Sequence, residues 1–109
     1  MKKNNAGEAL SPKIAFNVSK LDEQGLYGPA SGKQSISYEF CIPNDPQLIY
    51  EVQHIDPTVQ IGAFRGRIGC QRGVEVLCIG HTNQSNWRDA LVQLANLPYI
   101  TRIEQSFFE

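Results

Sequence analysis

The stretch from residue 57 to residue 97 constrains the fold more than any other part of the sequence, because a hairpin there leads directly into an amphipathic helix. The helix is predicted from apolar residues that recur at steps of three and four and therefore share one face. These residues are Trp87, Leu91, Leu94 and Leu97. Pro98 ends the pattern, since proline lacks a backbone N–H and restricts the residue before it.

The hairpin is predicted from a short, β-branched run, Val74–Ile79, which follows a turn at Gln71–Gly73. The first arm, from Val59 to Cys70, carries apolar residues on both alternating positions and contains three glycines. A strand of this kind cannot keep one apolar face, so we expect a bulge or an internal turn within it.

Ahead of the hairpin, Ser35–Ile42 alternates polar and apolar residues and predicts a strand with one buried face. A helix follows, with Asn44 or Asp45 as its cap and Pro46 as its first residue. Tyr99–Phe108 predicts a last strand with apolar residues on both faces. From residue 35 we therefore expect an α+β, ferredoxin-like βαββαβ fold, with a four-stranded antiparallel sheet and both helices on one face.

The segment before residue 35 lacks such clear patterns. We expect residues 1–12 to be a disordered tail and residues 13–34 to be an extended arm and loop. Residues 35–109 then form a single domain, because a chain of 109 residues has room for one small core.

The composition excludes few functions, but it narrows the cellular compartment and the classes of partner. The net charge of −1 gives no general attraction to nucleic acid, and no apolar run approaches the ~20 residues that cross a bilayer. The N-terminus has no apolar segment of a secretory signal, and three cysteines do not suggest a secreted disulfide framework. We therefore expect a cytoplasmic protein without nucleic-acid or membrane partners.

The cysteines are expected to be buried thiols, since Cys41, Cys70 and Cys78 lie in strand-like contexts. Their spacing lacks a CxxC pair, so we predict no metal site and no cofactor. An alternative makes Cys78 and His81 a nucleophile and its base, which requires the chain to turn between them.

The candidate site is the loop that opens the second helix. Helix N-termini attract anions through their backbone N–H groups and dipole, and guanidinium groups bind carboxylate or phosphate in a bidentate manner. We predict a site for a small anionic ligand formed by His81, Thr82, Asn83 and Ser85 and completed by Arg65, Arg67 and Arg72. The alternative is that the loop only caps the helix and the basic hairpin is only solvated.

Two functions are favoured over a third, RNA binding through the sheet, against which the net charge of −1 and the lack of an aromatic RNP-type motif stand. The first is a small ligand- or partner-binding module that forms a homodimer through its exposed sheet face, on which Ser37, Glu39 and Cys41 lie. The second is a small enzyme acting on an anionic substrate, with His81 as acid or base and the hairpin arginines as the anion clamp.

Overall fold

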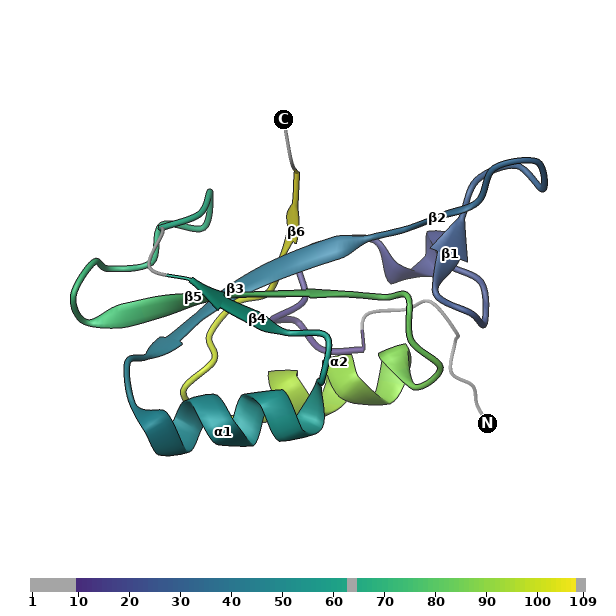
Figure 1. Ribbon diagram of the computed structural model, residues 1–109. Coiled ribbons are helices and arrows are strands. Elements are labelled where there is room, and N and C mark those ends of the chain that lie inside the picture. The colour runs from purple at the N-terminus through teal and green to yellow at the C-terminus, as the bar shows by residue number, and fades with distance from the viewer. Residues whose placement is uncertain (1–9, 63–64, 108–109) are drawn as a thin grey trace.

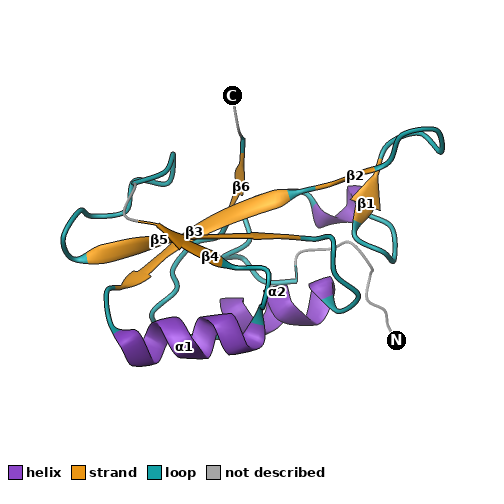
Figure 2. Ribbon diagram, viewed as in Figure 1, coloured by secondary structure: helices purple, strands orange, loops and turns teal. Residues whose placement is uncertain are grey.

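The main sheet of the protein has four strands in the order β4-β5-β3-β6, and every neighbouring pair is antiparallel (Figures 1 and 2). The computed structural model describes residues 10–62 and 65–107. The strands are β3 (Ser37–Pro43), β4 (Gln60–Gly62), β5 (Glu75–His81) and β6 (Glu104–Ser106). Residues 1–9 of the predicted tail lie outside the described residues.

Strand β3 is the centre of the core, as its alternating sequence predicts. Tyr38, Phe40 and Ile42 are fully buried on the face that the helices cover. Ser37, Glu39 and Cys41 point to the opposite, outer face, because successive side chains alternate along a strand. In the register, Phe40 is paired with Cys78 and Glu39 with Ile79, so β5 divides its side chains between the same two faces.

Both predicted helices are confirmed, and Figure 1 shows them on the same side of the main sheet. Helix α1 (Pro46–Ile55) begins as expected, with the Asp45 side chain accepting a hydrogen bond from Gln47 N at 2.8 Å. Helix α2 (Trp87–Ala95) buries Trp87, Leu91 and Leu94 of the predicted apolar stripe, whereas Leu97 lies beyond the helix and is half-buried. Its N-cap is Asn86, without a side-chain hydrogen bond. The stripe seals the core because Trp87, Leu91 and Leu94 are each at most 1% exposed.

The predicted ferredoxin-like fold, a single four-stranded sheet in βαββαβ order, is wrong. The strands belong to two separate sheets, and the second pairs β1 (Leu26–Tyr27) with β2 (Gln34–Ser35). The physical reason lies in the turn before β1. The Asp22 carboxylate accepts hydrogen bonds from Gln24 N and Leu26 N, at 2.9 Å and 3.0 Å, so this segment closes into its own hairpin.

The predicted arm of residues 13–34 also differs from a plain extended segment. A 3₁₀ helix, η1 (Val18–Lys20), interrupts it, and Ile14 makes a single parallel bridge with Ile103 beside β6. Ile14, Val18 and Leu21 are at most 8% exposed and belong to the main core. The arm therefore packs against the body of the protein.

The predicted hairpin and last strand are shorter than expected. The first arm of the hairpin is a strand only over β4, and a loop over residues 65–74 takes the place of the tight turn. Positions 63 and 64 of that arm and position 108 of the last strand lie outside the described residues. Within the described part of the chain, neither helix is long and apolar enough to cross a membrane.

Candidate functional site

The predicted anion-binding loop lies between β5 and α2, and its most buried residue serves the fold. Thr82 is fully buried, and its hydroxyl donates to Gly25 O at 2.6 Å while accepting from Ile36 N at 2.9 Å. The hydroxyl therefore joins the turn that ends at Gly25 to Ile36, which lies in the chain just before β3 (Ser37–Pro43). Asn83 and Ser85 are exposed and border a shallow cavity of about 270 Å³. Glu23 borders the same cavity, and its negative charge opposes an anionic ligand.

The loop and the predicted arginine clamp lie at opposite ends of the β3–β5 ladder. His81 pairs with Ser37 at one end of this ladder, whereas Cys70 of the arginine loop is bonded to Cys41 near the other (Figure 1). Arg65, Arg67 and Arg72 are exposed on that loop. The three predicted arginines therefore share one loop, which is a different loop from that of His81–Ser85.

His81 and Cys78 do not form a nucleophile and base. Cys78 is fully buried on the helix side of the sheet, and burial raises the pKa of its thiol to about 12. His81 is three positions further along β5 and faces the outer side. Its Nδ1 atom is buried and has no hydrogen-bond partner among the described residues.

A buried polar cluster that sequence reasoning missed lies under the sheet, where α1 ends. The Asp56 carboxylate is fully buried and accepts hydrogen bonds from Tyr38 Oη, from Thr58 N (3.0 Å) and Oγ1 (2.6 Å), and from Gln84 Nε2 (2.9 Å). Burial, followed by the Asp56 charge, raises the pKa of Tyr38 far above its ordinary value. All four donors meet one carboxylate, so the cluster fastens β3, α1 and the β5–α2 loop together.

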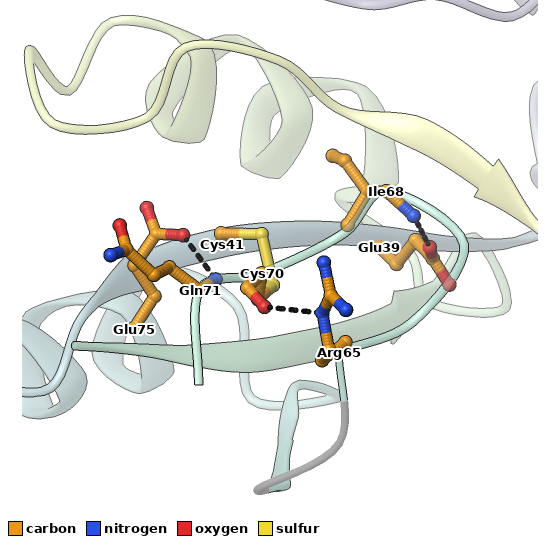
Figure 3. The surroundings of a disulfide bond; sticks show 7 residues. All are labelled: Glu39, Cys41, Arg65, Ile68, Cys70, Gln71 and Glu75. Atoms are coloured by element: carbon orange, nitrogen blue, oxygen red, sulfur yellow. Dashed lines mark hydrogen bonds between the residues drawn. A yellow bond between two sulfur atoms is a disulfide. The ribbon is translucent and has the colours of Figure 1, made fainter. Parts of the chain in front are cut away.

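A disulfide joins Cys41 on the outer face of β3 to Cys70 in the loop, with Cα atoms 5.4 Å apart (Figure 3). The expectation that both cysteines are thiols is therefore wrong. The bond holds the loop of residues 65–74 (the arginine loop) over the sheet, where Ile68 N donates to Glu39 Oε2 at 2.8 Å. Glu39 and Leu77 are each 3% exposed as a result. The number of cysteines in the sequence does not identify this pair, because the bond joins positions that are 29 residues apart.

No group of three or more His, Cys, Asp or Glu side chains is placed to hold a metal ion in the described part of the chain. The three cysteines are divided between the two faces of the sheet, since Cys78 faces the helices and the disulfide lies on the outer face. A shared metal site is therefore not available to them.

A second feature missed from the sequence is a cleft at the edge of β6. The N-terminal segment runs along this edge, where Ala15 N donates to Ile103 O and Ile103 N donates to Lys13 O, both at 2.8 Å. Beyond Ala15 the segment continues into η1, and a cavity of about 280 Å³ lies between it and β6. The lining residues are Ala15, Phe16, Asn17, Arg102, Glu104, Gln105 and Phe107.

The backbone of β6 faces this cleft at Gln105. The N–H and C=O of Ile103 point toward the N-terminal segment, and backbone groups alternate in direction along an antiparallel strand. Glu104 and Ser106 therefore direct theirs to β3, and Gln105 directs its own to the cleft side. Outside the sheet ladder, no described residue bonds to the Gln105 backbone. A strand edge of this kind is a ready template for another chain.

Comparison of the chain with models of protein families, with curated proteins and with solved structures finds no match in any of the three.

Proposed function

We propose that the protein is a small binding module that takes an extended segment of a partner protein as an added strand on β6. The observation that carries this proposal is the Gln105 backbone, which faces the cleft and, on that side, has no backbone hydrogen-bond partner among the described residues. Strand addition supplies affinity through main-chain hydrogen bonds, and pockets beside the strand supply specificity for alternate side chains.

The walls of the cleft indicate the chemistry of the segment. Phe16 stacks on the buried Tyr38 ring, with centroids 6.3 Å apart, which holds it as one apolar wall. Phe107 is 55% exposed and forms the opposite apolar wall. Arg102 and Glu104, an ion pair, add a polar rim. A segment with one apolar side chain between polar neighbours fits this arrangement, since alternate side chains of a strand face opposite sides.

A binding module is favoured over the enzyme predicted as the alternative. The Thr82 hydroxyl donates to and accepts from backbone groups, and the arginines lie on a different loop from His81. The predicted homodimer through the exposed sheet face also loses its basis, because the arginine loop covers Glu39 and Leu77 on that face. A small-anion site at Arg65, Arg67 and Arg72 stays a prediction.

The disulfide changes the cellular compartment that we propose for this function. Disulfides form and persist in oxidising compartments and are rare where cytosolic reductants keep thiols reduced. The Cys41–Cys70 bond therefore favours an oxidising compartment as the place of action, in preference to the cytoplasm expected from the odd number of cysteines.

The test uses a phage-displayed library of random heptapeptides selected on the immobilised full chain, with Gln105→Pro and Gln105→Ala as a matched pair. Proline removes the N–H that faces the cleft but no ladder bond, because that N–H points away from β3, and edge strands tolerate proline. Alanine removes only the side chain. Both variants should keep the far-ultraviolet circular dichroism of the original chain.

We expect peptides that bind the original chain and Gln105→Ala alike, and that bind Gln105→Pro at least about five-fold more weakly, the equivalent of one lost hydrogen bond. Peptides that bind all three proteins equally would place the site elsewhere. A library that yields no binder would refute peptide recognition by this edge.

A further inference from the structure

The arginine loop is attached to the sheet at two points beyond its own ends. One is the Cys41–Cys70 disulfide, and the other is the hydrogen bond from Ile68 N to Glu39 Oε2. Glu39 is 3% exposed, so this carboxylate depends on the loop for a partner in place of water. The two attachments lie side by side, since Glu39 and Cys41 share the outer face of β3 (Figure 3).

The loop is compact where it meets these attachments. The Arg65 carbonyl oxygen accepts from Gly69 N at 3.1 Å and from Cys70 N at 2.8 Å, which closes residues 65–70 into a turn. Gly66 has φ +66° and lies so close to the sheet that a side chain there would meet Leu77 Cδ1 at 2.8 Å. Residues 65–70 therefore form one hydrogen-bonded turn that rests against the sheet at Leu77.

This turn also touches the cleft of the proposed binding site. The Arg67 guanidinium carbon lies 5.8 Å from the centre of the Phe107 ring, which forms one wall of that cleft. Arg67 is adjacent to Ile68, the residue that bonds to Glu39. Displacement of the loop would therefore remove a cationic neighbour from the wall.

We propose that the Cys41–Cys70 disulfide is a redox switch for the cleft, an inference that rests on the proposed function at β6. In the oxidised protein the disulfide holds the arginine loop on the sheet and Arg67 against Phe107. Reduction by a dithiol breaks the S–S bond, adds two electrons and two protons to leave two thiols, and converts the dithiol to its own disulfide. The loop then leaves Glu39, which water hydrates, and peptide binding weakens.

Two features suit the bond to this role. Cys41 is half-buried whereas Cys70 is 2% exposed, so Cys41 is the more accessible of the two residues to an attacking thiolate. Cys78 lies on the other side of the sheet, and its buried thiol cannot exchange with the disulfide. Reduction therefore yields one defined reduced state without reshuffling.

The first measurement is amide hydrogen exchange by nuclear magnetic resonance on the full chain, before and after addition of dithiothreitol. We expect the Ile68 amide to lose its protection and the Phe107 ring resonances to shift, while the Cys78 amide in the centre of β5 stays protected. An unchanged Ile68 amide would overturn the inference. Loss of protection at Cys78 would also overturn it, since the disulfide would then support the whole fold.

The second measurement is the dissociation constant of a heptapeptide selected on the oxidised chain. Reduction should weaken binding about three-fold, the size of one cation–aromatic contact. Arg67→Ala should bind the peptide more weakly by the same factor, and reduction should not weaken its binding further. Arg72→Ala, a matched replacement of an arginine on the same loop, should behave like the original chain. Release of Ile68 without any change in affinity or in Phe107 would overturn the switch.

These readouts separate the two proposals. Hydrogen exchange and the Phe107 resonances require no peptide, so they test the switch even if the library yields no binder. A missing binder together with a redox-dependent Phe107 ring would refute peptide recognition while supporting control of the cleft by the disulfide.

Discussion

Replacement of Tyr38 by phenylalanine removes one hydroxyl from the polar cluster around Asp56 and leaves the ring in place. Asp56 is fully buried, and among the described residues Tyr38 is the only donor to its Oδ2 atom. Three further hydrogen bonds reach Oδ1, so the carboxylate stays partly satisfied. A hydrogen bond to a charged group contributes about 1.5–3 kcal/mol, and we expect Tyr38→Phe to lower the free energy of unfolding by about 2 kcal/mol.

The same hydroxyl makes stability depend on pH in the alkaline range. Burial, then the Asp56 charge, raises the pKa of Tyr38 above its ordinary value of 10.0, so the folded protein retains a proton that the unfolded chain loses. The contribution is therefore fully present below pH 10 and is lost as pH rises above it. The stability difference between the original chain and Tyr38→Phe should shrink by about 1 kcal/mol between pH 10 and pH 11.

The assay is urea unfolding at pH 7, 10 and 11, followed by the fluorescence of Trp87, the only tryptophan, which is 1% exposed in the folded protein. Tyr50→Phe is the matched control, because Tyr50 is 70% exposed and its replacement should change stability by less than about 0.5 kcal/mol. A loss below about 0.5 kcal/mol for Tyr38→Phe, or a difference that does not vary with pH, would refute the role assigned to the cluster.

Three further predictions concern the backbone and the cysteines. Replacing Cys41 and Cys70 by alanine should lower the free energy of unfolding by about 3.5 kcal/mol and the melting temperature by about 15 °C, given the 29-residue separation. A thermal unfolding scan in which the melting temperature falls by less than ~3 °C would contradict this. Gly25→Ala should lower the free energy of unfolding in urea by about 3 kcal/mol, because φ is +79° and the new Cβ would collide with a backbone carbonyl. Gly73→Ala, with φ +82° and open space around it, should lower it by about 1 kcal/mol. Equal losses for the two variants would argue against the collision. Iodoacetamide at pH 8 should alkylate Cys78 at least ~100-fold more slowly in the folded protein than in urea, since burial raises its pKa to about 12, and comparable rates measured by mass spectrometry would disprove its burial.

Several parts of the fold could be predicted because their causes lie in consecutive residues. The alternation of Ser35–Ile42 identifies a strand and its buried face, since side chains alternate every second residue. Asp45 and Pro46 identify the start of α1 through capping and a preset φ. The apolar steps after Trp87 identify α2 and the face that it buries.

The candidate site could be predicted only in part. The sequence indicates that the loop after His81 opens a helix, and this position is correct. The use of that loop depends on residues far away, since the Thr82 hydroxyl bonds to Gly25 O, 57 positions earlier in the chain. The same amino acid types cap helices and bind ligands, so the role of such a residue is not known until its partner in the folded protein is known.

By itself the sequence determined where α1, α2 and the central strand β3 lie and which of their faces are apolar, because periodicity and capping act over a few neighbouring residues. Only the tertiary structure decided that Cys41 pairs with Cys70, that the arginine loop covers Glu39 on the outer face, and that a cleft lies beside Gln105 of β6. Each of these depends on contacts between segments distant in the sequence. Such contacts form only when the whole core packs, so no local pattern encodes them.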